Sequence, residues 1–289
     1  MAIKNNLNNT VKRALVGVLT DWEQPNIGGG GGGAAVAWDL SSATLTSSGS
    51  LDLSAASSTL KGLFFDANGE EVVHSAGNAS ANAYKDGDLS TAWDFTSYAN
   101  GTTKASIDTT PGGIWVNSAG TNLYYAGDQF DRIFKTVMST PWQCSSGGTE
   151  TNADISSTVT APLALWINAA ETRVIVINAT TAYSFTMSTP GDLSTLSYDS
   201  ASLTLTSVTS ARAVFCHPTG NQMFILDSDD DIHEYSFNTT LDLTDTNYEG
   251  KITLTITGTN PRALFIENDY IVVGDETSRI AYQFAFGPH

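Results

Sequence analysis

A short strand-like motif recurs at a nearly constant interval along this 289-residue chain. Each copy has a small residue, an aliphatic residue, an aromatic residue and then an apolar or soft residue, as at residues 164–167. The aromatic residues of the five copies are Phe64, Trp115, Trp166, Phe215 and Phe265, at intervals of 51, 51, 49 and 50 residues. A repeat of about fifty residues is typical of propellers, solenoids and arrays, in which each unit covers its neighbour.

Each unit continues with further predicted strands. A turn rich in Asn, Asp and Gly follows the aromatic, and these residues suit tight turns because they tolerate positive φ or bond their own backbone. A second strand, a polar hairpin and a third strand follow; the third-strand aromatics are Tyr84, Phe134, Tyr183, Tyr235 and Tyr282. A last strand rich in Ser, Thr and aliphatics ends the unit. Alternating polarity with frequent turns predicts an all-β fold, and four strands per unit make a propeller blade.

The fifth unit lacks its last strand at the C-terminus, and a matching segment occurs near the N-terminus. Residues 38–53 match residues 191–205 and lead into the next unit in the same way. We therefore predict a five-bladed β-propeller over residues 35–289, with the N-terminal strand closing the last blade. An open solenoid would need atypical polar end units, and none is evident. An irregular β-sandwich is the alternative fold.

A loop between the third and fourth strands has its own motif. It reads MSTPGDLST at residues 187–195 and MSTPW at residues 138–142, and a third strand reads DIHEY at residues 231–235. With these motifs, the chain from about residue 35 to its end resembles propeller-repeat proteins encoded by bacteriophages and marine bacteria. The first and fifth units match least. The resemblance implies a repeat protein with a virion or surface role; it implies no catalytic residue or cofactor.

The charge balance argues against two classes of partner. The chain has 30 acidic and 13 basic residues, a net charge of −17. Nucleic-acid binding depends on Lys and Arg neutralising phosphates, so we expect neither nucleic acid nor an anionic membrane as a partner. Cys144 and Cys216 occupy different positions in different units, which predicts free buried thiols rather than a disulfide.

The N-terminus carries no sign of secretion. Its first apolar run, residues 14–19, is short and has no cleavage site after it. No stretch approaches the roughly 20 apolar residues of a membrane helix. We expect synthesis in a host cytoplasm and, from the resemblance, a place in the virion.

Residues 1–34 stand outside the repeat and predict a basic helical arm with a flexible glycine linker. Six glycines at residues 28–33 form the linker. The apolar face of the predicted helix consists of Leu7, Val11, Leu15, Val18 and Leu19. We expect this face to anchor the propeller to other virion proteins in a multi-copy assembly; a disordered tail is the alternative.

Three tryptophans, Trp38, Trp93 and Trp142, occupy the same loop position in three units. Tryptophan on a loop can stack on a sugar ring, so these residues are candidate ligand-binding residues. The equivalent residues elsewhere are Gly191 and Leu241, which favours the alternative that each tryptophan covers the edge of its own blade.

Acidic residues recur beside these loops and in one hairpin. Asp39, Asp94, Asp192 and Asp242 each have Ser or Thr two residues later, a pattern typical of structural turn bonds. Residues 227–231 resemble part of a calcium loop but lack the Gly and the distal Glu of an EF-hand. We interpret them as a solvated acidic turn, with adventitious cation binding as the alternative, and predict no dedicated metal site.

Catalytic motifs are missing from the sequence. The four histidines are scattered without metal-ligand spacing, and no Gly-x-Ser-x-Gly is present. Enzymatic propellers place carboxylates on first strands at the channel, whereas these strands are apolar and only Asp66 and Glu267 come near. We therefore predict no enzymatic activity.

Three functions remain in order of preference. The first is a non-enzymatic structural or adhesion protein of a phage tail, fibre or capsid, attached through its arm. The second is a lectin-like propeller that binds a carbohydrate, including a host surface glycan. The third is a glycan hydrolase, which would need two channel carboxylates about 5 to 10 Å apart.

Overall fold

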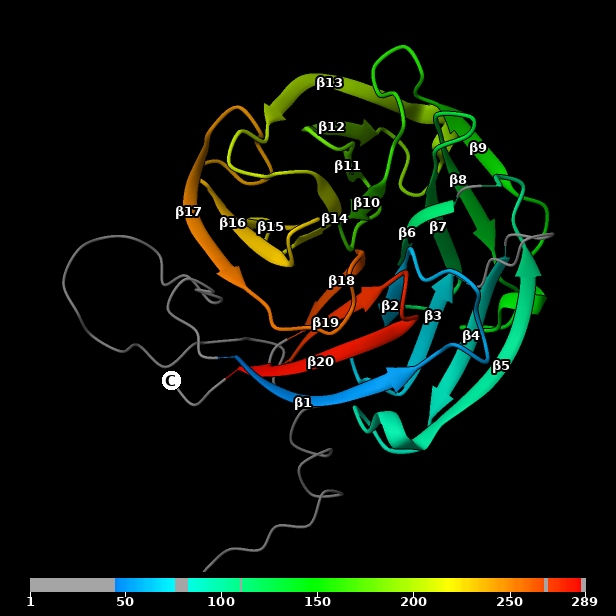
Figure 1. Cartoon of the computed structure of the whole chain (residues 1–289). Helices are drawn as coiled ribbons and strands as arrows, with labels where there is room; N and C mark the ends of the chain where they lie inside the picture. Colours follow the sequence, from blue (N-terminus) through cyan, green and yellow to red (C-terminus); the bar gives the residue numbers. More distant parts are fainter. Residues whose placement is uncertain (1–44, 76–82, 110, 268–269, 287–289) are drawn as a thin grey trace, which may run out of the picture. The chain divides into compact units, whose positions relative to one another are not determined.

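The computed structural model describes residues 45–75, 83–109, 111–267 and 270–286. These residues form five four-stranded antiparallel sheets that surround a common axis (Figure 1). The prediction of an all-β, five-bladed propeller is confirmed. The arm of residues 1–34, with Leu7, Val11, Leu15, Val18 and Leu19, lies outside the described residues, as do Trp38 and Asp39.

The blades follow the order of the repeats. The first has β2 (Leu63–Phe65), β3 (Glu71–Ser75), β4 (Ala83–Leu89) and β5 (Tyr98–Ala105); the second has β6 (Pro111–Val116), β7 (Asn122–Gly127), β8 (Arg132–Val137) and β9 (Thr151–Asp154). The third has β10 (Ala164–Ile167), β11 (Arg173–Ile177), β12 (Thr181–Met187) and β13 (Leu196–Thr204); the fourth has β14 (Ala211–Cys216), β15 (Gln222–Asp227), β16 (Asp231–Phe237) and β17 (Thr246–Thr253). The fifth has β18 (Pro261–Glu267), β19 (Tyr270–Asp275), β20 (Ile280–Phe286) and β1 (Leu45–Asp52).

Burial falls from the axis to the rim of each blade. Every residue of β6 and β10 is buried, whereas β5 and β17 alternate between exposed and half-buried positions. An inner strand is covered on both faces, so it is apolar throughout; an outer strand has one face in water, so its residues alternate. This difference explains why the first strands of the repeats are so similar in sequence.

The chain ends meet in the fifth blade. β1 pairs antiparallel with β20, from Leu45 opposite Phe286 to Asp52 opposite Ile280. Figure 1 shows β1, the first described strand, alongside β20, the last. The prediction that an N-terminal strand completes the last blade is confirmed, and this pairing joins the two ends of the propeller into one sheet.

Neighbouring blades are held together by buried aromatic side chains. Tyr84 of β4 lies 4.9 Å from Tyr125 of β7, ring centre to ring centre, and Tyr125 stacks on Phe134 of β8 at 4.7 Å. All three side chains are fully buried. The third-strand aromatics Tyr84 and Phe134 therefore belong to the core between the first and second blades.

Both cysteines are free and buried, as the sequence predicts. Burial raises the pKa of the Cys144 and Cys216 thiols, which makes them unreactive. Within the part of the chain that the structure describes, no helix has the length and apolar character needed to cross a membrane.

Candidate functional site

The five repeat aromatics meet at the propeller axis. Phe64 lies 5.9 Å from Trp115 and 5.1 Å from Phe265, and Phe265 lies 5.5 Å from Phe215, between ring centres. Each inner strand contributes one aromatic at the same register, so a spacing of about fifty residues in sequence becomes a ring in space. Trp115, Trp166, Phe215 and Phe265 are buried, while Phe64 is half-buried.

A cavity of about 310 Å³ opens beside this ring, where the inner strands end. We call it the axial cup. All five blades contribute to it: its aromatic wall consists of Phe64, Phe65, Trp115, Trp142, Trp166, Phe215 and Phe265. Its polar lining residues are Asp66, Asn68, Ser118 and Glu267. An apolar wall with a few polar groups, at a volume of some 300 Å³, is the usual character of a small-ligand site.

The two acidic residues that the sequence places near the channel both line the axial cup. Asp66 begins the turn after β2, and its Oδ1 accepts hydrogen bonds from the backbone N–H groups of Glu70 (2.8 Å) and Glu71 (2.9 Å). Asn117 and Asn168 begin their turns in the same way. Asp66 is therefore a turn residue of the repeat that also faces the cup.

Glu267 departs from this repeat. Five residues separate the first and second strands in each of the other blades, but only two separate β18 from β19. Glu267 ends β18 and lines the axial cup. Acidic chemistry in the cup is asymmetric, because its two acids, Asp66 and Glu267, come from the first and the fifth blades.

Trp142 and Trp93 occupy the same loop position, but they lie in different surroundings. Trp142 lines the axial cup and stacks on Phe64 at 6.5 Å and 19°. Trp93 packs against Phe65 at 5.4 Å and stacks on Tyr270 at 5.1 Å; it is not among the residues that line the cup. The structure therefore brings one of the two described tryptophans to the candidate site.

Each of these tryptophans also covers the turn of its own blade. Their φ angles are 59° at Trp93 and 60° at Trp142, in the left-handed region. A Cβ added at Gly69 would lie 2.2 Å from the Trp93 ring, and one at Gly120 would lie 2.3 Å from the Trp142 ring. The turn glycine and the large loop residue thus form a packed pair.

The third blade reverses this pair, and sequence reasoning missed it. Glu171 stands at the turn position and Gly191 at the loop position, both with positive φ. Glu171 accepts hydrogen bonds from Tyr124, Asn122 (2.7 Å) and Asn117 (3.0 Å) of the second blade. The sequence carries the signal, because Glu171 stands five residues after its axial aromatic, where the first two blades have glycine, and Gly191 stands where they have tryptophan.

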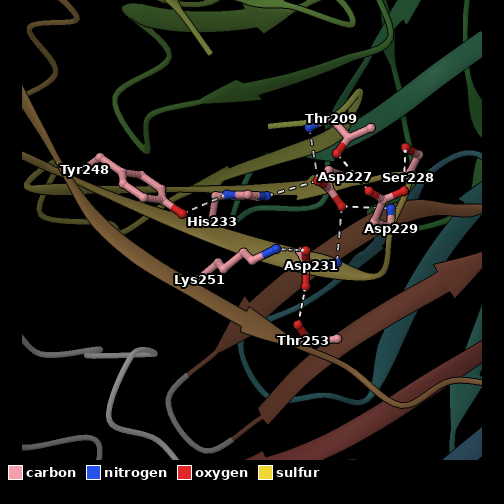
Figure 2. Close-up of polar contacts among 9 residues, drawn as sticks. All are labelled: Thr209, Asp227, Ser228, Asp229, Asp231, His233, Tyr248, Lys251 and Thr253. Carbon is pink, nitrogen blue, oxygen red and sulfur yellow. Dashed lines mark hydrogen bonds and ion pairs between the residues drawn. The ribbon is translucent and has the colours of Figure 1, made fainter. Parts of the chain in front are cut away.

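The fourth blade contains a buried polar network (Figure 2). Nε2 of His233 lies 3.0 Å from Oδ2 of Asp227, and Nδ1 of His233 lies 3.1 Å from the hydroxyl of Tyr248. Asp231 accepts hydrogen bonds from Lys251 and Thr253. Asp227, Asp231 and His233 are at most 4% exposed, so the prediction of a solvated acidic turn is wrong for these two aspartates.

The hairpin buries these carboxylates because their acceptor atoms are satisfied inside the fold. Asp227 accepts the backbone N–H groups of Asp229 (2.8 Å), Asp231 (3.2 Å) and Thr209 (3.2 Å). Burial alone raises the pKa of Asp227, but hydrogen bonds from His233 and from the backbone outweigh it, so its pKa lies below the ordinary value.

The described part of the chain contains one group of side chains that could bind a metal ion, formed by Asp227, Asp231 and His233. Their ligand atoms lie within 4.8 Å of one another. Their hydrogen bonds already complete the network, however. Asp275, at the same repeat position as Asp227, likewise accepts backbone N–H groups, from Asn260 (2.6 Å) and Ser278 (2.7 Å). We conclude that Asp227 has a structural role: its hydrogen bonds join the turn between β15 and β16 to the loop that contains Thr209.

The aspartates beside the loop motif have the structural role that the sequence predicts. Asp94, Asp192 and Asp242 each accept the backbone N–H of the residue two positions on, at 3.0, 2.9 and 2.9 Å. The same oxygens accept the Ser or Thr hydroxyls, each at 2.7 Å. These bonds hold short 3₁₀ turns at Phe95–Ser97 and Leu193–Thr195.

Comparisons with known proteins support the fold alone. No family model matches the chain, and no curated protein matches it. A Bacteroides fragilis protein described as a "putative 6-phosphogluconolactonase" superposes with a TM-score of 0.51 at 12% identity, over 78% of this chain and 79% of that one. A Bacteroides uniformis protein of the same description gives 0.50 at 13% identity, over 78% and 80%.

A functionally unknown protein from Desulfotomaculum acetoxidans gives a TM-score of 0.45 at 8% identity, over 75% of this chain. This chain spans 63% of the length of that protein. The superpositions on the two Bacteroides proteins show the β-propeller fold alone and assign no activity.

Proposed function

We propose that this chain is a non-enzymatic adhesion protein that binds a sugar unit of a glycan in the axial cup. The observation that carries the proposal is the cup itself, an aromatic-walled cavity of about 310 Å³ to which all five blades contribute. The apolar C–H face of a pyranose ring packs on aromatic rings such as Trp142. The carboxylates of Asp66 and Glu267 and the amide of Asn68 are suited to hydrogen-bond the sugar hydroxyls.

The setting that we propose is a phage particle, with the propeller displayed on a tail, fibre or capsid. Its support is the resemblance of the repeats to phage-encoded propellers, together with the predicted basic arm of residues 1–34. In this setting the arm holds other virion proteins, the cup faces a host surface glycan, and many copies act together, so that weak single sites give strong attachment.

The binding test is a glycan array probed with the full chain, followed by calorimetry with the best ligand. We expect Trp142→Ala to weaken binding at least about tenfold, since it removes one aromatic wall of the cup. Trp93→Ala is the matched control, because it removes the same side chain from the same loop position outside the cup; we expect a change below about threefold.

A silent array, or equal loss of affinity in both variants, would contradict the proposal. Recovery of the bound glycan intact is also expected. Cleavage would instead make Asp66 and Glu267 candidate catalytic carboxylates, and their substitution by Asn and Gln would be the next experiment.

The virion setting has a separate test. Mass spectrometry of purified particles should find the chain in many copies, and deletion of residues 1–34 should abolish its incorporation. Incorporation that is unchanged by the deletion would refute the role of the arm and leave the sugar site untouched.

A further inference from the structure

A second axial cavity, of about 140 Å³, lies where the inner strands begin, at the end of the channel opposite the axial cup. All five blades contribute to this cavity too. Its lining residues are Lys61, Gly112, Asp128, Pro162, Leu163, Arg212 and Arg262. We call it the cationic mouth, because three of the 13 basic residues of a chain with net charge −17 gather there.

These three cations occupy one position of the repeat. Lys61, Arg212 and Arg262 each precede the axial aromatic of their blade by three residues. Gly112 and Leu163 stand at the same position in the second and third blades. The repeat therefore forms a second ring around the axis, cationic over three adjacent blades and uncharged over the other two.

A β-bulge sets the position of both arginines. Ala211 pairs with Asp227 and Ala213 with Leu226, so Arg212 is an extra residue without an opposite partner. Arg262 is likewise extra between Pro261, opposite Asp275, and Ala263, opposite Gly274. Bulges redirect side chains, which allows residues three apart on one strand both to line the channel.

The carboxylates near these cations leave one guanidinium nitrogen without a hydrogen-bond partner. Glu276 forms ion pairs with two of the cations. Its Oε2 lies 3.0 Å from Nε of Arg262, and its Oε1 lies 3.7 Å from Nζ of Lys61. Asp128 lines the cavity as the second carboxylate. Nε of Arg212 is buried and has no hydrogen-bond partner. The residues that line the cavity include three cations and one carboxylate. Glu276 and Asp227 add negative charge near Arg212, but the buried Nε of Arg212 remains an unused donor.

The environment of Arg212 agrees with this geometry. Burial, and then the neighbouring Arg262, lower the pKa of the Arg212 guanidinium, and together they outweigh Glu276 and Asp227, which raise it. A bound anion would relieve both unfavourable effects, because it would accept hydrogen bonds from Arg212 and neutralise the repulsion between the two arginines.

We propose that the cationic mouth binds a small molecule through an oxyanion, a carboxylate or a phosphoryl group. Arg212 is the principal donor, and Arg262 and Lys61 flank the anion. Arginine suits such groups because its planar donors match their oxygen atoms. The cavity volume of about 140 Å³ restricts the ligand to a small molecule or to the end of a larger one.

The test is titration of the full chain with inorganic phosphate and, separately, with acetate, at constant ionic strength maintained by sodium chloride. Constant ionic strength keeps the screening of exposed charges the same throughout the titration, so a saturable signal reports binding of the probe. We expect saturable binding of at least one probe by calorimetry. Binding of phosphate alone indicates a phosphoryl ligand, and binding of acetate alone a carboxylate; both support the site.

Arg212→Gln should weaken binding at least about tenfold, since it removes the principal charged hydrogen-bond donor to the anion. Lys61→Gln should weaken it less and serves as the second variant if Arg212→Gln fails to fold. Arg132→Gln is the control: it removes the same charge, but Arg132 pairs with Asp154 outside the channel. Absence of saturable binding of both probes, or equal affinities for Arg212→Gln and Arg132→Gln, would overturn the proposal.

Discussion

The axial cup and the cationic mouth lie at opposite ends of the five inner strands, at repeat positions three residues apart, and their chemistry is opposite. The cup position is aromatic in every blade, and its polar residues include the acids Asp66 and Glu267. The mouth position is cationic in three blades and uncharged in two. In a propeller, the residues at one repeat position form a ring around the axis. A position that is aromatic in every blade fills the axis with apolar side chains, whereas a position that differs between blades can carry specific polar groups.

The largest effect is expected when the stability of Phe265→Ala is compared with that of Arg262→Gln. The two residues are three positions apart on β18. Phe265 is 2% exposed and contacts Phe64, Phe65 and Phe215. We expect its loss to lower the free energy of unfolding by about 3 to 5 kcal/mol, because it leaves a cavity between blades.

Arg262→Gln should cost only about 1 kcal/mol, since Glu276 retains Lys61 and Asn260. Urea unfolding of both variants gives the comparison. Similar losses for both would show that the cationic mouth supports the fold as much as the aromatic ring does.

A smaller effect is expected at the turn below Trp142. Gly120 has a φ of 69°, and a Cβ there would lie 2.3 Å from the indole ring. Gly120→Ala should therefore cost about 1 to 3 kcal/mol from left-handed strain and displacement of the ring. It should also lower the affinity of the axial cup for its ligand, while the affinity of the cationic mouth for phosphate or acetate stays unchanged.

Gly148→Ala is the control for this substitution, because the added Cβ there would have only the carbonyl oxygen of Val137 nearby, at 3.7 Å. Its unfolding midpoint should match the parent protein. An equal loss in Gly148→Ala would mean that the tryptophan is not the cause.

The smallest effect on stability is expected from the titration of Glu71, which follows the turn at the edge of the cup. Glu71 follows the Asp66 turn, and its pKa is raised to about 7, first by burial and then by Asp88 and Asp66. A raised carboxyl pKa means that the folded state holds this proton more tightly than the unfolded state. Protonation therefore stabilises the fold as pH falls from about 8 towards 5, and most of the gain is present below about 4.5.

Glu71→Gln should remove this contribution, so the variant should be more stable than the parent at pH 8 by a fraction of a kcal/mol and nearly equal to it at pH 4.5. Thermal unfolding at several pH values measures the difference. An unchanged pH profile in Glu71→Gln would assign the titration to another group.

Sequence reasoning recovered the fold because the fifty-residue period and the alternation of polar and apolar residues are local signals. It identified the five axial aromatics as strand markers, without showing that they form one wall. It noted Asp66 and Glu267 near the channel, but it missed the ring of Lys61, Arg212 and Arg262, because the bulges that direct the arginines leave no pattern of alternation.

Two further differences arise from packing between residues far apart in sequence. Trp93 and Trp142 share one motif, yet Tyr270 of another blade covers the first and the axial cup adjoins the second. Asp227 belongs to an acid-rich hairpin that looks solvent-exposed in sequence, but backbone N–H groups from its own turn and from Thr209 compensate its burial.

The sequence by itself determined the all-β class, the five blades and the closing strand at the N-terminus, since each depends on residues that repeat at a fixed spacing. Only the tertiary structure decided which side chains share a cavity and which acids are buried. The physical reason is that period and alternation describe each strand by itself, whereas a site at the axis depends on five strands meeting with a common register.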